Sequence, residues 1–374
     1  MLQPRGSDRR GWECSRPRPP VRVDLVPGLS HLGVDHTWQT RPRLRFVTMT
    51  RIESRTVLDR DTLDEILDLI EVTTKLEGHR PVGEHKYSHL KVGAVGWLGV
   101  LAHEHDELIG YAHTRWGQPN QRPRVAVEVV VHPDWRRDGE VAIALLDETR
   151  AAVARAGGGL MFLWVHRVER ADQTLAFELG FDIQRELAFM SRSLDGQPPA
   201  PALPDGVVLC PYGGEQDDRA FLAVNNAAFA GHPENGDWSA EDFAERRERD
   251  WFEPADLLMA WRGDELVGFH WTKWHGHESE EIPAHEPVGE VYVLAVDPDA
   301  QSTGLGRSLL DAGVRHLYDR GCRQAILYVD CASTAAVRLY ETAGFTHHYR
   351  DVCYQQWIDP AYEDAAVDLR RPNY

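Results

Sequence analysis

The sequence predicts an α/β (α+β) protein that contains two tandem copies of one fold. Strand-like apolar runs alternate with helical patterns after Met49, and the order of these elements repeats after a Pro/Ala-rich stretch at 197–204. Matching landmarks also recur at nearly constant spacing, since 165 positions separate Val131–Asp134 from Val296–Asp299 and 164 separate Gly180-Phe181 from Gly344-Phe345. Two landmarks in register within one residue indicate an internal duplication.

The composition is typical of a soluble globular protein with room for two domains. The 374 residues are 42% hydrophobic and 27% charged, and no apolar run approaches the length of a membrane span. A formal net charge of −18 argues against a general nucleic-acid partner. The five cysteines are scattered and form no C-x-x-C pair, so we expect no disulfide framework, no zinc site and a reducing cytoplasmic setting.

The predicted domain boundaries follow from composition. Residues 1–48 are rich in Arg and Pro and lack apolar periodicity, so we expect a disordered extension rather than a targeting arm. Prolines make 195–204 a stiff linker. The halves are therefore predicted to span 49–194 and 205–360, with a tail at 361–374.

In the first half, a helical pattern should run from Met49 through the apolar residues at 63, 66, 67 and 70, with Asp61 or Thr62 as its cap. After it we expect a hairpin of strands 97–101 and 107–112, a buried strand 125–131, helix 140–156, strand 160–165, a short helix ending at 180, and a strand reaching about 193.

The second half repeats this order. We expect helix 221–230, strands 257–261, 266–271 and 290–296, a helix from 305 to about 320, strand 325–329, helix 333–342 and a final strand.

The most informative stretch joins strand 290–296 to the following helix and consists of Gln301, Ser302, Thr303, Gly304, Leu305, Gly306 and Arg307. The two glycines let backbone amides approach a bulky anion. The helix N-terminus adds the positive end of a dipole, and the arginine adds a full charge. The pattern Q-x-x-G-x-G-R is neither the dinucleotide fingerprint nor the Walker loop.

After a strand ending in V-x-V, this loop resembles the pyrophosphate loop of the GNAT superfamily of N-acetyltransferases. The resemblance implies acetyl-CoA as cosubstrate, without a metal, and two domains that are each a mixed, mostly antiparallel sheet flanked by helices. It also implies that the coenzyme arm lies along the strand end, where a bulge frees the backbone groups of Leu294, Ala295 and Val296. The turn opening the later helix would contact the coenzyme through Ser333, Thr334, Ala335, Ala336, Val337 and Arg338, although Ser333 is also a good helix cap.

Two titratable residues stand where acyl transfer to an amine needs them. Glu290 opens the core strand and could take the proton of an attacking ammonium, directly or through water. In the family that the loop resembles, a tyrosine at the position of Tyr340 protonates the departing thiolate. Counted back from the landmarks, Val125 and Ala176 stand at these two places in the first half.

The first half therefore reads as a degenerate copy. Its loop has Gly139, but Val141 replaces Gly306, Ala142 replaces Arg307, and Asp138 and Glu140 add carboxylates. We expect weakened or absent coenzyme binding there, with Arg136 and Arg137 as a partial remedy. If coenzyme does bind, its arm should pair with Val129, Val130 and Val131.

Three further stretches, at 81–84, 225–238 and 268–274, resemble the mycothiol acetyltransferases of actinobacteria. That family transfers acetyl to the cysteinyl amine of a cysteine–glucosamine–inositol pseudodisaccharide. The resemblance implies that Glu84, Glu234, Lys273, Glu290 and Tyr328 contact this small-molecule amine and thiol, with no nucleic-acid or membrane partner.

Alternatives remain open at this point. The enzyme could act on another small-molecule or protein amine, or the chain could be a non-catalytic acetyl-CoA-binding module. The stretch 275–285 is longer than the corresponding join in that family and holds three histidines, but their spacing fits no standard metal motif. We expect a monomer.

Overall fold

The computed structural model describes residues 50–83, 87, 90, 97–116, 124–136, 139–232, 235–276 and 286–361. The described strands form one twelve-stranded sheet in the order β1-β2-β3-β4-β5-β12-β6-β11-β10-β9-β8-β7. The expected extension and most of the expected tail lie outside the described residues.

The first half runs from β1 to β6. Its elements are β1 (Arg51–Arg55), α1 (Arg60–Glu77), β2 (Trp97–Glu104), β3 (Glu107–Trp116), β4 (Arg124–Val131), α3 (Glu140–Arg155), β5 (Gly159–Val165), α4 (Arg170–Glu178) and β6 (Asp182–Ser193). The helix predicted from Met49 begins only at Arg60, and Asp59 caps it by accepting a hydrogen bond from Thr62 N (2.8 Å), not Asp61 or Thr62.

The second half repeats the pattern. Its elements are β7 (Val207–Pro211), α5 (Asp218–Ala228), α6 (Ala240–Arg247), β8 (Leu257–Arg262), β9 (Glu265–His275), β10 (Val288–Val296), α7 (Leu305–Asp319), β11 (Gln324–Asp330), α8 (Thr334–Thr342) and β12 (Thr346–Ile358). Residues 194–204 form neither a helix nor a strand. Strands β1 and β7 and helix α6 were not predicted from the sequence, because they are short elements with little apolar periodicity.

Each half packs helices on both faces of its strands. In the first half α1 covers a cluster that contains Tyr111, while α3 covers a separate cluster that contains Ala112. Because successive strand residues point to opposite faces, Tyr111 and Ala112 pack into different cores. The second half repeats this arrangement with α5 over Phe269 and α7 over Val267.

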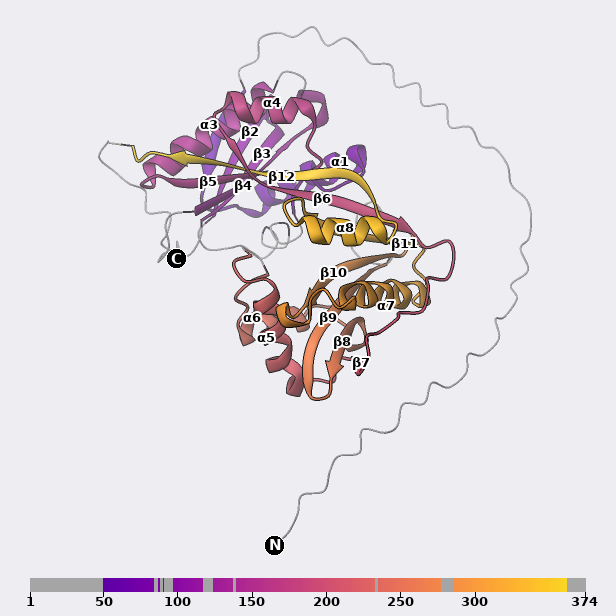
Figure 1. Cartoon of the computed structure of the whole chain (residues 1–374). Helices are drawn as coiled ribbons and strands as arrows, with labels where there is room; N and C mark the ends of the chain where they lie inside the picture. The colour runs from indigo at the N-terminus through magenta and orange to yellow at the C-terminus, as the bar shows by residue number, and fades with distance from the viewer. Residues whose placement is uncertain are drawn as a thin grey trace, which may run out of the picture. The chain divides into compact units, whose positions relative to one another are not determined.

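The last strand of each half is exchanged. Strand β6 pairs with β11 from Gln324↔Ser193 to Asp330↔Leu187, and β12 lies between β5 and β6 (Figure 1). Val352 and Tyr354 of β12 are fully buried in the first-half core, while Ala188 and Met190 of β6 are buried in the second-half core. Each half thus supplies a strand to the other half's part of the sheet, a connection that was not predicted from the sequence.

Candidate active site

The candidate site lies where β10 and β11 separate. These parallel strands pair only over Val288–Glu290, after which β11 continues to Asp330 along β6. The register between β10 and β9 shifts between Val291 and Val293, so that Tyr292 is the extra residue of a bulge. Beyond it Leu294 and Val296 are half-buried and Ala295 is buried. The divergence opens the β11-facing side of β10 over the stretch predicted to pair with the coenzyme arm.

The turn after β10 has the backbone of an anion-binding loop. Gly304 caps α7 at φ 86° without a side-chain hydrogen bond, and Ser302 has φ 63°. Residues 301–304 are exposed. The first N–H groups of a helix have no partner within the helix, so those at the start of α7 can serve an anion.

Gly306 and Arg307 differ in how open they are to a ligand. A Cβ added at Gly306 would lie 3.6 Å from Val296 Cγ2, so the protein's own packing does not require glycine there. Arg307 donates from Nε to both oxygens of Asp311 (3.0 and 2.9 Å) and from Nη1 to Thr342 O (3.2 Å). The full charge expected from this guanidinium is therefore shared with Asp311.

The turn before α8 places the other residues predicted to bind coenzyme. Ser333 occupies the N-cap position of α8, as expected, but its side chain makes no capping hydrogen bond. Ser333, Thr334, Ala335 and Arg338 are exposed, whereas Ala336 and Val337 pack against the second-half core.

Tyr340, on α8, is buried. It is 8% exposed, meets Phe345 edge-on at 5.9 Å, and belongs to the same core cluster as Val291 of β10. Burial raises the pKa of its hydroxyl well above the ordinary tyrosine value. The phenol therefore keeps its proton at neutral pH, as a general acid must.

Glu290 lies half-buried beside two basic side chains. In the ladder it stands opposite Lys273 of β9, and its Oε2 is 2.7 Å from His275 Nε2. Lys273 is only 5% exposed, and its Nζ lies 4.8 Å from the centre of the Trp251 ring, a cation–π contact. The structure thus brings together the predicted base and one predicted substrate residue, and adds His275 and Trp251, which the sequence analysis left out of the site.

Of the three other residues predicted to bind the substrate, the structure describes only Tyr328. Tyr328 is 45% exposed on β11, and its hydroxyl lies 3.2 Å from that of Tyr349. Glu84 and Glu234 lie outside the described residues.

The first half has apolar residues at the positions that correspond to Glu290 and Tyr340, the two residues predicted to be catalytic. Val125 and Ala176 are buried in its core. Its loop keeps the left-handed glycine, since Gly139 has φ 68°, but Val141 is buried. Arg136 was expected to compensate partly for the altered loop. It donates from Nε to Val131 O (2.9 Å) and pairs with Glu77, so its charge is already partly neutralised. Arg137 lies outside the described residues.

A buried charge cluster in the first half has no counterpart in the sequence predictions. His166 Nδ1 lies 2.9 Å from Asp351 Oδ2 of β12, and its Nε2 lies 3.4 Å from Glu128 Oε1 of β4. Glu128 also accepts a hydrogen bond from Gly83 N (3.0 Å). Burial by itself would lower the pKa of His166, but the hydrogen bonds to Asp351 and Glu128 outweigh it and raise the pKa to about 9.

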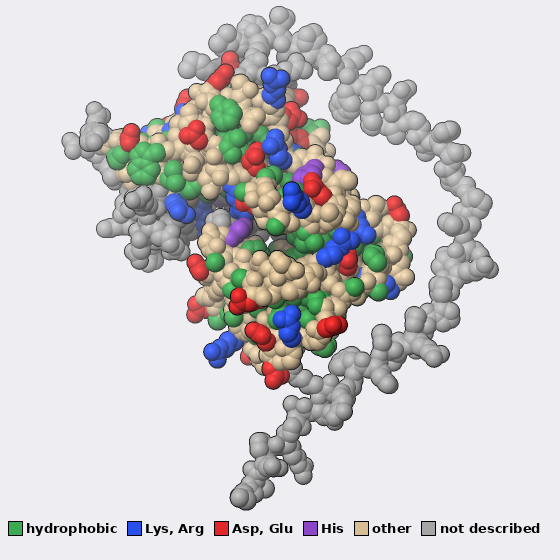
Figure 2. Space-filling model, in the orientation of Figure 1, with side chains coloured by type: hydrophobic (Ala, Val, Ile, Leu, Met, Phe, Trp, Pro, Cys, Tyr) green, Lys and Arg blue, Asp and Glu red, His purple; other side chains and the backbone are tan. Residues whose placement is uncertain are grey.

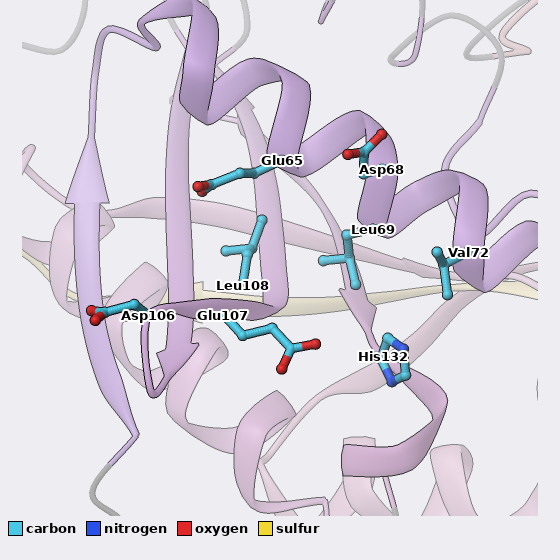
Figure 3. Close-up of a pocket in the computed structure, with 8 residues that line it drawn as sticks. All are labelled: Glu65, Asp68, Leu69, Val72, Asp106, Glu107, Leu108 and His132. Atoms are coloured by element: carbon cyan, nitrogen blue, oxygen red, sulfur yellow. The ribbon is translucent and has the colours of Figure 1, made fainter.

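A pocket of about 270 Å³ lies elsewhere in the first half, between α1 and the β2–β3 turn (Figure 3). None of the predicted site residues lines it. Its walls carry the carboxylates of Glu65, Asp68, Asp106 and Glu107 beside His132. Four carboxylates repel coenzyme phosphates, so this pocket does not fit the coenzyme.

On the face shown in Figure 2, acidic and basic side chains of the described residues are interspersed. Within the described part of the chain, His, Cys, Asp and Glu form no group of three or more that could hold a metal ion. Among the same residues, no helix combines the length and apolar character of a membrane-spanning segment.

Comparison with known proteins identifies the fold. The acetyltransferase (GNAT) family model matches residues 222–345, which contain the splayed strands, the loop and Tyr340. A tandem GNAT protein from the clavulanic acid biosynthesis pathway superposes with a TM-score of 0.62 at 15% identity, covering 84% of this chain and all of that chain. A GCN5-related N-acetyltransferase from Sphaerobacter thermophilus gives a TM-score of 0.61 at 22% identity, covering 83% of this chain and 97% of that one. The chain therefore has a tandem GNAT fold.

Relatives identified by sequence share a higher identity with this chain than these solved structures do. A mycothiol acetyltransferase of Streptosporangium roseum is 39% identical over 347 residues, covering 82% of this chain and 99% of the relative. One of Thermobispora bispora is 42% identical over 294 residues, covering 78% of this chain and 95% of the relative. With this identity over nearly the full length of its relatives, the chain belongs to the mycothiol acetyltransferase family.

Proposed function

We propose that this enzyme transfers the acetyl group of acetyl-CoA to the cysteinyl amine of cysteinyl-glucosaminyl-inositol, giving mycothiol. One observation carries the proposal within this family: among the described residues, only the second half joins a splayed, bulged strand with a glycine-capped helix, an acidic residue and a buried tyrosine. The acceptor in this proposal is a small polyhydroxylated molecule that carries an amine and a thiol.

Glu290 acts first. It accepts a proton from the substrate ammonium, directly or through one water, and frees the nitrogen lone pair to attack the thioester carbonyl. Lys273 and His275, as cations beside this carboxylate, favour its ionised form. The new C–N bond forms as the C–S bond breaks, and Tyr340 donates its hydroxyl proton to the departing thiolate.

The chain's backbone holds the cosubstrate. Amides from Gln301 to Arg307 and the positive end of α7 would face the diphosphate, while Leu294–Val296 would pair with the pantetheine amides. The turn at 333–338 would contact the rest of the coenzyme. This assignment involves no metal.

The acceptor would lie against polar groups from both halves. Glu84, Glu234, Lys273 and Tyr328 are the contacts we assign, since hydroxyls and an ammonium need carboxylate and hydroxyl partners. In this assignment the first half binds no coenzyme and provides one wall of the acceptor site. We also propose that the enzyme works as a monomer in the cytoplasm.

The test is direct acetyl transfer. Purified enzyme is incubated with acetyl-CoA and cysteinyl-glucosaminyl-inositol, and the product is identified by mass spectrometry and fragmentation. We expect one acetyl group on the cysteinyl nitrogen, and none on glucosaminyl-inositol, which lacks the cysteinyl amine. Release of CoA without acetylation of the cysteinyl compound, or acetylation only of unrelated amines, would overturn the proposal.

A further inference from the structure

His275 makes a short contact with the proposed base. Its Nε2 lies 2.7 Å from Glu290 Oε2, and the side chains are 13% and 16% exposed. His275 pairs with Val288 and Lys273 pairs with Glu290 in the β9–β10 ladder. Because strand side chains alternate between faces, the histidine, the lysine and the glutamate project from the same face.

The strand end that carries His275 is held by packing. A Cβ added at Gly276 would lie 2.0 Å from Trp274 Cη2, so the Trp274 indole covers the backbone directly after His275. The Arg320 guanidinium of the second half lies 5.6 Å from the centre of the Trp274 ring. Packing of Trp274 and Arg320 therefore holds the end of β9 that carries the imidazole.

We propose that His275 is a positioning residue for Glu290 in acetyl transfer. The inference rests on the proposed function. His275 donates its Nε2 hydrogen to the Glu290 carboxylate, holds that carboxylate in one orientation, and stabilises its ionised form. Glu290 then takes the proton from the substrate ammonium, and His275 itself touches no substrate.

Other charged or titratable groups also face Glu290, so the role of His275 has to be separated from theirs. Lys273 stands directly opposite across the ladder. The Glu290 charge also acts on Tyr292 of the bulge and Tyr328 of β11. None of these groups changes in a His275 variant, so a difference from the wild type reports the imidazole.

The first experiment measures the pH dependence of kcat at saturating concentrations of both substrates. In His275→Ala we expect kcat at neutral pH to fall about tenfold and the acidic limb to move up by about one pH unit, because an opposite charge within hydrogen-bond distance lowers a carboxyl pKa by about 1–3 units. His275→Gln keeps an N–H donor that cannot gain a charge. It should recover most of the plateau kcat while keeping the displaced limb.

His316→Gln is the matched control. His316 Nε2 lies 2.7 Å from Asp256 Oδ1, the same separation, on the C-terminal part of α7. We expect this variant to lower thermal stability and leave the acidic limb in place. An acidic limb in His275→Ala and His275→Gln that coincides with the wild type would overturn the inference.

A second readout needs no turnover. The His275 imidazole is titrated by NMR in the wild type and in Glu290→Gln, and we expect its midpoint to fall by about one pH unit or more when the carboxylate is removed. An unchanged midpoint would contradict the inference. Absence of acetyl transfer in the wild type, with the NMR coupling intact, would count against the proposed function alone.

Discussion

At the scale of single residues, the proposed base and the proposed acid have different surroundings. Glu290 is half-buried between Lys273 and His275, which favour a charged carboxylate, whereas Tyr340 is buried among apolar side chains, which favour a neutral phenol. At neutral pH the first group can take a proton and the second can give one. The ordinary pKa values of the two side chains already give these protonation states at neutral pH, and the surroundings of each residue reinforce them.

Removing the Tyr340 hydroxyl should slow the reaction without disturbing the fold. We expect kcat of Tyr340→Phe to fall about a hundredfold, the ordinary size of a general-acid contribution, with a melting temperature close to the wild type. Tyr354→Phe is the matched control, since Tyr354 is a fully buried tyrosine of the first-half core. Equal kcat values for the two variants in a steady-state assay would contradict the assignment.

At the scale of elements, the repeat indicates what the proposed coenzyme loop requires. Both halves begin a helix at a left-handed glycine, Gly304 or Gly139, so this feature alone does not separate them. The difference lies two residues later, where Gly306 leaves the amides of α7 accessible and Val141 is buried against the first-half core. One side chain at this position could therefore decide whether a diphosphate can approach.

Gly306→Val transfers the first-half residue to the second half. The added Cβ meets only ordinary contacts at 3.6 and 3.8 Å, so we expect the variant to fold. The branched side chain should block the coenzyme diphosphate and raise the Kd for acetyl-CoA at least tenfold, equivalent to about 1.4 kcal/mol, in isothermal titration calorimetry. The reciprocal Val141→Gly should leave this Kd unchanged, and an unaltered Kd in Gly306→Val would argue against the loop as the diphosphate site.

At the scale of the whole molecule, the exchanged strands make each half dependent on the other. Strand β12 contributes Val352 and Tyr354 to the first-half core, and β6 contributes Ala188 and Met190 to the second-half core. Full burial of one large apolar side chain stabilises a fold by about 1.5–3 kcal/mol. Since domains are stable by only about 5–15 kcal/mol, loss of a whole buried strand leaves little or no stability.

Separating the halves tests this dependence. Residues 49–196 and 205–361 expressed alone should be unfolded or aggregated, because each would lack one central strand and expose a sheet edge. Co-expressed, the two pieces should copurify and regain acetyltransferase activity. Two stable, monomeric fragments with cooperative thermal transitions would contradict this prediction, and the same cut placed inside α7 serves as the control that does not reassemble.

The charge cluster that joins β4 to β12 predicts a pH dependence of stability. The folded-state pKa of His166, about 9, exceeds the ordinary value of 6.5. Its stabilisation is therefore complete below about pH 6.5 and is lost as pH rises through about 9. The difference corresponds to about 3 kcal/mol in the free energy of unfolding, since one pKa unit is about 1.4 kcal/mol.

Urea denaturation at pH 6, 7.5 and 9.5 measures this effect. His166→Gln should lose most of the decrease that the wild type shows between the lowest and highest pH. His347→Gln, which removes an exposed partner of Glu341, should retain that decrease. A wild-type stability that does not fall above pH 7.5 would show that the cluster carries no protonation-linked stabilisation.

The sequence by itself determined the duplication, the order of most elements, the glycine-capped loop and the family. Local sequence patterns predict these features: apolar periodicity, glycine at positions of positive φ, and landmarks at constant spacing. The short elements β1, β7 and α6 escaped because a few residues carry too little periodicity, and the N-terminal strand was absorbed into the helical pattern that follows it.

Only the tertiary structure decided which strands pair and which side chains meet. Nothing local distinguishes a last strand that closes its own sheet from one that closes the other half's, because local propensity indicates that a segment forms a strand and not which strand it pairs with. The contact between His275 and Glu290 likewise joins residues from different strands, and the pairing register of β9 and β10 brings them together. Periodicity fixes which face a residue takes, whereas pairing register fixes its neighbours, and register depends on long-range packing.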